Sequence, residues 1–387
     1  YFLATIACIT ILAPFSIDAY LPAIVDISIS LSSSDNLTQL TIAVFLFGFS
    51  MGPLIFGPLS DAWGRKKLIL LSLMMFCLFS FLCSISQNIY TLILFRFFQA
   101  VAGSVSTVCG RASLADLLSG DDLARKNSIL GLMLTIAPIL APIIGGWINF
   151  FYGWRAIFLF MTVFGVIFVL ISFFRIPETL EIKNRTSFKF KNIFNIYYNI
   201  LKNTSALFYI LYLSASSTVF FAYLSASPFL YISKFNLSPI MYSYVFGAGA
   251  IIAALSNILL IKFSPVFGYK KIISWSCILI IINSIILFLG GIELLGRWSI
   301  YLSGLMFMGL FQIANATSLT GLMDEFSKGK GAATALAISI RFAFGMLGAI
   351  LISLLSNETI YPYVIIVLIF GILSSIAGWL AINFSKK

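Results

Sequence analysis

Four charged side chains stand inside long apolar stretches of the sequence, namely Asp18, Arg96, Arg111 and Arg341. A charge deep in a bilayer costs at least about 2.5–3.5 kcal/mol, so its retention indicates a role. Asp18 is the one among them that can bind and release a proton, because arginine stays protonated and the chain has no histidine. Every other acidic residue stands near a predicted helix end or in a connecting segment. We therefore predict that Asp18 is the proton-coupling residue.

Asp18 and Arg96 each lie eight residues from the expected outer end of their apolar stretch, which is about 12 Å along a helix. We expect the two charges to lie at matching depth. Burial favours the neutral form of Asp18, whereas a nearby guanidinium favours the ionised form. In one interpretation, protons and cationic or polar cargo compete for this carboxyl group. In the other, a permanent ion pair pins two helices. We favour the first, since intramembrane acids often line transport paths.

The remaining candidates for a substrate cavity are weaker. Arg111 lies about 22 Å beyond Arg96 on the same predicted helix, close to its inner end, where its side chain can reach the interface. Arg341 lies about 16 Å past Lys330, near mid-membrane, and has either a structural partner or a place in the cavity lining. Aromatic rings can bind cationic cargo. The predicted cavity residues are Arg96, Gln99, Tyr20, Tyr223 and Arg341.

Composition identifies the kind of element that must position these residues. Of 387 residues, 60% are hydrophobic and 10% are charged, and the mean hydropathy is +1.06. Soluble domains carry about 25% charged residues, so a soluble globule, a disordered chain and a disulfide scaffold are excluded. The five cysteines lie in apolar segments without a CxxC pair, which argues against disulfides and a metal site. They are Cys8, Cys77, Cys83, Cys109 and Cys277.

The apolar runs predict an all-α integral membrane protein with twelve transmembrane helices, each of about 20 residues. The predicted helices are 2–25, 37–59, 67–86, 89–117, 127–150, 153–174, 205–231, 239–262, 271–291, 298–322, 331–355 and 362–382. We divide the chain into a six-helix bundle (1–174), a basic cytoplasmic linker (175–204) and a second six-helix bundle (205–387). Residues 188–203 read as an amphipathic helix on the cytoplasmic leaflet. Because Tyr1 already lies in an apolar run, we expect the natural N-terminus to precede it.

Basic residues fix the expected orientation. Lysine and arginine gather in alternate connecting segments, including Arg65 to Lys67, the linker 175–204, and the tail with Lys386 and Lys387. Short basic loops remain on the cytoplasmic side, so both termini are expected there. This topology accounts for the net charge of +11 without nucleic-acid binding.

Two short stretches recur at nearly the same offset. Residues 19–23 (AYLPA) return as 222–226 (AYLSA), and residues 63–67 (WGRKK) return as 267–271 (FGYKK). Together they predict a duplication of six helices. Transporters are often built from such repeats, with the substrate site between them.

Residues 57–67 carry the pattern G-x-x-x-D-x-x-G-R-K between two apolar helices. Gly57 would let two helices approach, Gly64 would permit a tight turn, and Asp61 with Arg65 can form a latch. This pattern resembles the loop signature of the major facilitator superfamily. Residues 16–23, 96–100 and 137–146 resemble the corresponding motifs of the Bcr/CflA drug-resistance transporters, and residues 324–326 and 331–342 fit the same family.

The resemblance implies an exporter of the bacterial cytoplasmic (inner) membrane that exchanges protons for drugs by alternating access. In it Asp18 couples protons, while Arg96 and Gln99 tune that group and contact cargo. The implied cytoplasmic gate comprises Gly57, Asp61, Gly64, Arg65 and Asp116. The implied antiporter motif comprises Pro138, Pro142, Gly145 and Gly146. The chain departs from the family at Ala115, Ala137 and Ala141. A functional monomer driven by the proton gradient, without cofactor or metal, is also implied.

Other functional classes fit less well. No ATP-binding loop is present, since residues 327–331 (SKGKG) do not satisfy its pattern. One deep carboxyl group without histidine does not assemble an enzyme site. A channel or a non-transporting sensor is disfavoured by the repeat. The principal alternative cargo is an endogenous metabolite, a siderophore or a peptide.

Overall fold

The computed structural model describes residues 2–118, 120–185, 190–327, 329–355 and 359–385. Over these ranges the regular structure is entirely helical, and twelve helices are long and apolar enough to cross a membrane. The predicted all-α class and the number of spans are confirmed. The predicted basic residues Lys328, Lys386 and Lys387 lie outside the described residues.

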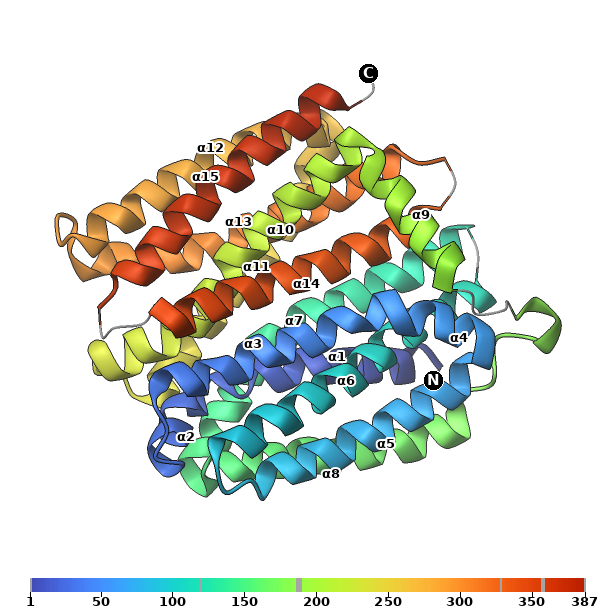
Figure 1. Ribbon diagram of the computed structural model, residues 1–387, viewed down its shortest axis with the longest axis horizontal. Coiled ribbons are helices and arrows are strands. Elements are labelled where there is room, and N and C mark those ends of the chain that lie inside the picture. Colours follow the sequence, from blue (N-terminus) through green and yellow to red (C-terminus); the bar gives the residue numbers. More distant parts are fainter. Residues whose placement is uncertain (1, 119, 186–189, 328, 356–358, 386–387) are drawn as a thin grey trace. The chain divides into compact units, whose positions relative to one another are not determined.

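The first six spans are formed by eight α-helices (Figure 1). They are α1 (Phe2–Asp18) and α2 (Ile24–Ser30), α3 (Asp35–Met51) and α4 (Gly57–Trp63), α5 (Arg65–Ser84), α6 (Ile89–Leu117), α7 (Gly120–Tyr152) and α8 (Trp154–Arg175). The predicted continuous helix 2–25 is wrong in one respect. The first span breaks after Asp18 and resumes through a 3₁₀ turn, Leu21–Ala23. A π-helical turn, Gly52–Phe56, joins α3 to α4.

The remaining helices begin with one that is too short to span a membrane. They are α9 (Phe190–Lys202), α10 (Thr204–Pro228) continued by a π-helical turn (Phe229–Lys234), α11 (Pro239–Phe267), α12 (Tyr269–Gly291), α13 (Gly296–Asp324), α14 (Lys330–Leu355) and α15 (Tyr361–Phe384). Most of the predicted bounds agree within a few residues, because long apolar runs mark their own ends.

The chain forms two compact units. One comprises Tyr1–Phe190 with Phe235–Gly247, and the other comprises Lys191–Lys234 with Ala248–Lys387. The first turns of α11 therefore belong with the first unit. The domain boundaries expected from sequence, at 174 and 205, remain predictions.

In the first unit, α6 packs against α1, α3 and α5 through small residues. A Cβ added at Gly103 would lie 2.5 Å from the Cβ of Ala13 on α1, and one at Gly48 would lie 2.6 Å from the Phe97 carbonyl oxygen. Apolar burial does not drive helix association in lipid, so close approach depends on such residues. Gly57 does not serve this purpose, because its added Cβ would make an ordinary 3.8 Å contact with Val108.

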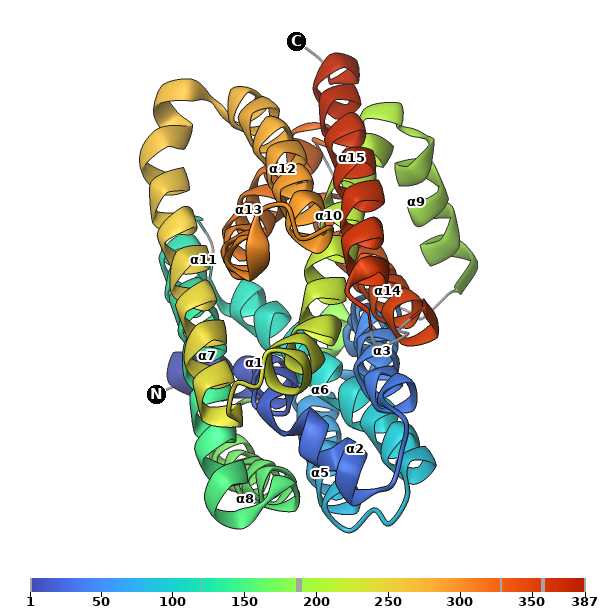
Figure 2. The same ribbon diagram turned by 90° about the vertical axis from the view of Figure 1, so that its left-hand side faces the viewer.

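In the second unit, α10 is the most buried span and lies beside α14 and α15 in both views (Figures 1 and 2). Hydroxyl groups link it to its neighbours. Ser216 bonds to Ser374 on α15 at 2.7 Å, and Tyr212 bonds to Ser276 on α12 at 2.6 Å. These contacts satisfy polar groups that lipid would leave without partners.

Helix α9 occupies most of the predicted amphipathic segment 188–203 and leads into α10 at an angle (Figure 1). Ile200 is buried, whereas Phe194 and Tyr198 are exposed and stacked with ring centroids 6.5 Å apart. The Lys202 ammonium lies 4.6 Å from the centre of the Tyr198 ring. The contact of this helix with the cytoplasmic leaflet remains a prediction.

Candidate functional site

Asp18 is the last residue of α1, at the break in the first span. The break follows from Pro22, which has no N–H to offer the Asp18 carbonyl four residues earlier. The Asp18 side chain is buried, with 6% of the residue exposed, and it has no hydrogen bond or ion pair with any described residue. A carboxyl group at a helix break, inside a span, is suited to exchange a proton or an ion.

Gly145 brings α7 close to this break. A Cβ added at Gly145 would overlap the carbonyl oxygen of Ala19 and lie 2.7 Å from its carbonyl carbon. On the next face of α7, an added Cβ at Gly146 would overlap the Ser243 hydroxyl on the first turns of α11. Pro138 and Pro142 lie within α7, which continues through both. The antiporter-like motif thus places α7 against the backbone next to Asp18.

Arg96 lies on α6 inside a box of aromatic rings. Its guanidinium carbon is 4.2 Å from the ring centre of Phe45, 4.7 Å from that of Tyr20 and 5.8 Å from that of Phe158. The residue is fully buried. Face-on contacts of this kind stabilise a desolvated cation by about 2 kcal/mol or more, so the rings replace part of the water that Arg96 loses.

Arg96 is bonded to Gln99 rather than to Asp18. Its Nη1 donates to Gln99 Oε1 at 2.7 Å and to the Ser16 carbonyl at 3.5 Å. Gln99 Nε2 in turn donates to the Ser80 hydroxyl at 2.7 Å. Over the described residues, Nε and Nη2 of Arg96 have no hydrogen-bond partner. The alternative of a permanent Asp18–Arg96 pair therefore does not hold in this structure.

Gln99→Leu should destabilise the protein, because it removes the acceptor of a buried guanidinium N–H. A hydrogen bond to a charged group contributes about 1.5–3 kcal/mol. We expect a lower Tm for the detergent-solubilised variant. Thr135→Val is the control, since the Thr135 hydroxyl bonds to the Gly131 carbonyl of its own helix at 2.9 Å. Equal Tm values for the two variants would contradict this role of Gln99.

The other predicted cavity residues lie in different places. Tyr20 is buried in the first unit, where its hydroxyl bonds to Thr41 at 2.7 Å. Tyr223 is buried in the second unit, 6.4 Å from the ring centres of both Tyr231 and Tyr363. Both tyrosines are enclosed within their own units, so their contact with cargo remains a prediction.

Arg341 lies on α14 in the second unit. Its Nη1 donates to Asn315 Oδ1 on α13 at 2.7 Å, and its guanidinium carbon is 4.4 Å from the Phe342 ring centre. This bond between two helices supports the structural interpretation, and the place of Arg341 in a cavity lining remains a prediction. Arg111 is exposed, and the reach of its side chain to the interface remains a prediction.

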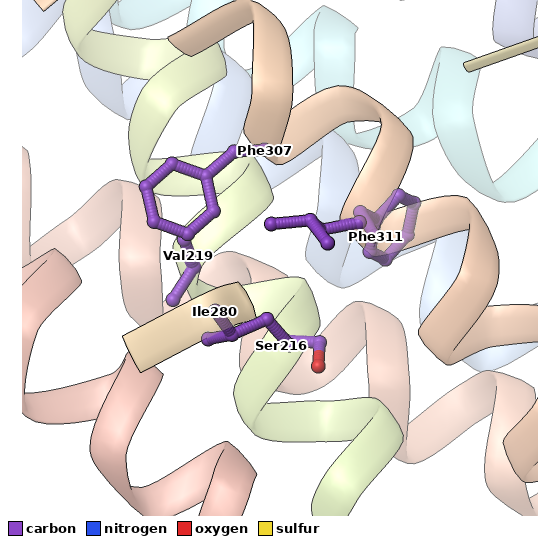
Figure 3. Close-up of a pocket in the computed structure, with 6 residues that line it drawn as sticks. Ser216, Val219, Ile280, Phe307 and Phe311 are labelled. Atoms are coloured by element: carbon purple, nitrogen blue, oxygen red, sulfur yellow. The ribbon is translucent and has the colours of Figure 1, made fainter. Parts of the chain in front are cut away.

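A small hollow lies within the second unit (Figure 3). Its cavity volume is only about 10 Å³, and α10, α12 and α13 provide its lining. The residues that line it are Ser216, Val219, Ile280, Phe307, Leu310 and Phe311. Its lining has no charged group and includes none of the predicted site residues, so we do not assign it to the candidate site.

Where α4 meets α5 in the first unit, Arg65 joins two carboxylates. Its Nη1 is 2.6 Å from Asp61 Oδ1 and its Nε is 3.0 Å from Asp116 Oδ2. Its Nη1 also donates to the Ser60 hydroxyl, and 7% of its side chain is exposed. We call Ser60, Asp61, Arg65 and Asp116 the Arg65 cluster. The structure thus forms the predicted latch of Asp61 with Arg65 and adds to it Asp116, which the family resemblance implies as a gate residue.

Gly64 turns the chain between α4 and α5. Its φ of +98° lies in the region that favours glycine, as sequence predicts for this tight turn. Gly268 occupies the repeated position before α12, with φ of +75°. The equivalence supports the predicted duplication, although Tyr269 stands where Arg65 does in the first half. Phe221 likewise stands where Asp18 does, so the proposed proton chemistry belongs to one half.

Two further residues contact the Arg65 cluster, and neither is among the predicted site residues. Glu178 Oε1 accepts from the backbone N–H of Arg65 at 2.9 Å, and the Thr179 hydroxyl donates to Asp116 Oδ2 at 2.9 Å. Both follow α8 by a few residues. The one local signal was an acid just after a helix end, among the basic residues Arg175, Lys183 and Arg185.

Comparison with known proteins finds similarity to one family of membrane transporters over most of the chain. The model of the family described as Major Facilitator Superfamily matches residues 6–353. A Bicyclomycin resistance protein homolog of Haemophilus influenzae is 27% identical over 361 residues, covering 93% of this chain and 91% of that protein. Multidrug resistance protein D of Escherichia coli is 29% identical over 180 residues, which is 45% of each chain.

Solved structures show the same fold at low identity. The nucleoside transporter NupG has a TM-score of 0.75 at 14% identity, covering 100% of both chains. A bacterial homologue of the human lysosomal transporter Spinster has a TM-score of 0.76 at 14% identity, covering 100% of this chain and 97% of the other. The curated relatives confirm the resemblance to the Bcr/CflA drug-resistance transporters.

Proposed function

The chain belongs to the major facilitator superfamily, and from that membership we propose that it is a proton-coupled antiporter. It exports drugs or related small molecules from the cytoplasm by alternating access. The family and the fold make it a multi-pass membrane transporter rather than an enzyme. Support for a drug as cargo comes from the bicyclomycin-resistance and multidrug-resistance relatives.

The observation that carries the proposal is the Asp18 carboxyl group, buried at a helix break and without an ion-pair partner in the described chain. A buried carboxyl group without a counter-charge favours its neutral form. In another conformation, water or cargo that reaches it favours the ionised form. Asp18 therefore binds a proton in one state of the transport cycle and releases it in the other.

Arg96 acts on Asp18 at a distance in this scheme. In the structure its charge is held by Gln99, the Ser16 carbonyl and the aromatic box. Arg96 lies on a helix that packs against α1, so a shift between these helices changes its distance from Asp18. Because the energy of two charges depends on that distance, the shift alters proton affinity and links it to conformation.

The Arg65 cluster is the proposed cytoplasmic gate. Arg65→Ala removes the cation between Asp61 and Asp116 and should weaken the gate. Cys109 is a natural reporter, since its thiol is fully buried near the Ser60 hydroxyl. In a protein that keeps Cys109 as its single cysteine, we expect Arg65→Ala to speed alkylation by N-ethylmaleimide. An unchanged rate would argue against a gate at this position.

The proposed setting is a bacterial inner membrane, with both termini in the cytoplasm and a monomer as the functional unit. No cofactor is required, since the proton gradient supplies the energy. A potential of 100 mV acting on one exchanged charge provides about 2.3 kcal/mol. At 1.4 kcal/mol per tenfold, this sustains a cargo gradient of roughly 50-fold, and a pH difference adds to it.

Expression in a pump-deficient bacterial host tests this function. Cells carrying the protein should survive higher concentrations of some members of a chemically diverse compound set. They should also accumulate less of those compounds until a protonophore collapses the gradient. A result without protection against any compound would favour a metabolite, a siderophore or a peptide as cargo. Export that persists after the gradient collapses would overturn proton coupling.

A further inference from the structure

The segment that leaves α8 is fastened to the Arg65 cluster. We call residues 176–185 the strap. Ile176 anchors it, with 1% of the residue exposed. Just before it, the Phe173 carbonyl accepts from Lys66 Nζ at 3.0 Å. The strap thus begins against the first turn of α5 and continues toward α9, which lies in the second unit.

Glu178 caps the N-terminus of α5. The first N–H groups of a helix have no partner inside it and carry a partial positive charge. Glu178 Oε1 accepts from the Arg65 N–H at 2.9 Å, so the cap falls on the gate residue itself. Gly64 leaves room for this carboxylate, since an added Cβ would overlap Glu178 Oε2 and lie 2.8 Å from Arg185 Nη2.

Other bonds hold the Glu178 carboxylate in position. Its Oε1 also accepts from the Leu180 N–H at 3.2 Å, which closes a turn of the strap. Its Oε2 is 3.7 Å from Arg185 Nη2 at the far end of the same segment. The Glu178 carboxylate therefore both caps α5 and holds the two ends of the strap together.

Thr179 reaches the cluster from its other side. Asp116 Oδ2 accepts both from the Thr179 hydroxyl at 2.9 Å and from Arg65 Nε at 3.0 Å. The two strap residues thus contact both partners of one ion pair, Glu178 at the backbone of Arg65 and Thr179 at the carboxylate of Asp116. A loop that merely links two helices has no need of this pattern.

We propose that the strap is a working part of the gate, with Glu178 and Thr179 as positioning residues for Arg65 and Asp116. Displacement of the linker withdraws the cap from α5 and the hydroxyl from Asp116 together, so the cluster loosens when the linker moves. This inference rests on the proposed gate. It adds that the linker between the units controls the cluster.

Cys109 alkylation tests the strap without knowledge of the cargo. In inside-out membrane vesicles that contain the single-cysteine protein, Glu178→Ala should be alkylated by N-ethylmaleimide about tenfold faster, as expected for loss of about 1.4 kcal/mol of gate closure. Glu178→Gln keeps an acceptor for the Arg65 N–H but loses the charge, so its rate should be intermediate. Thr179→Val should also be faster than the parent protein.

Glu181→Ala is the matched control, since Glu181 lies in the same strap but pairs with Lys183 in solvent, 2.8 Å away. It should react at the parent rate. Hydrogen–deuterium exchange gives a second measurement: Glu178→Ala and Glu178→Gln should speed exchange in the first turn of α5, whereas Glu181→Ala should not.

Arg65→Ala separates the two proposals. Arg65→Ala could speed alkylation while Glu178→Ala, Glu178→Gln and Thr179→Val all react at the parent rate. The proposed role of the strap would then be wrong, and the proposed gate would be supported. If Arg65→Ala also leaves the alkylation rate unchanged, both the proposed gate and the proposed role of the strap are wrong. If Glu178→Ala does not insert, the milder Glu178→Gln and Thr179→Val decide.

Discussion

Asp18→Asn should abolish proton-driven transport while the protein still folds and inserts. Asparagine has nearly the same shape but cannot release a proton. The Asp18 carboxyl group makes no hydrogen bond or ion pair with a described residue, so the exchange breaks no contact seen in the fold. In reconstituted vesicles that contain a pH-sensitive dye, addition of a compound that the parent protein exports should no longer move protons.

Asp35→Asn is the control, because it makes the same chemical change at an exposed position outside the candidate site. Asp35 is exposed at the start of α3 and accepts from the Ser28 hydroxyl at 2.9 Å. Its variant should move protons as the parent protein does. Proton movement that persists at the parental rate in Asp18→Asn would show that another group carries the proton, and the proposed energy source would be lost.

Gly145→Ala should have the second largest effect. Its new methyl group would overlap the Ala19 carbonyl oxygen, next to Asp18, and the atom in its way is backbone rather than a movable side chain. Overpacking typically costs about 1–3 kcal/mol, and more where the backbone must move. We expect a lower Tm and a transport rate reduced at least about tenfold, since 1.4 kcal/mol already corresponds to that factor.

Gly131→Ala tests whether loss of any glycine in α7 has this effect. Among the described residues, no atom lies within 4 Å of a Cβ added at Gly131. Alanine is favoured over glycine in a helix by about 1 kcal/mol, so this variant should be as stable as the parent protein or more so. If Gly145→Ala also keeps the parental Tm and rate, α7 and α1 do not meet as closely as the structure has them.

The halves of the chain differ in how far their chemistry could be foreseen. The repeated stretches placed Gly64 and Gly268 at equivalent turns, and both have positive φ. Their neighbours do not match, since Tyr269 replaces Arg65 and Phe221 replaces Asp18. The repeat thus predicted a shared backbone plan, whereas Asp18 and the Arg65 cluster belong to the first half alone.

Asp18 lies farther from the end of its span than its sequence position predicts. The predicted helix ends near Asp26, but α2 runs to Ser30, twelve residues past Asp18, or about 18 Å of helix. The span also breaks after Asp18, and Pro22 is the local signal for that break. Two charges at similar depth need not meet, because their directions depend on how α1 and α6 rotate about their axes.

The sequence alone determined the spans, the basic loops and the latch between Asp61 and Arg65. Each depends on chemistry within one segment: apolar length, loop charge or a spacing of four residues along a helix. Only the tertiary structure decided that Arg96 bonds to Gln99 within an aromatic box, and that Glu178 caps α5 from 113 residues away. Such partners are chosen by helix packing and rotation, which no local pattern encodes.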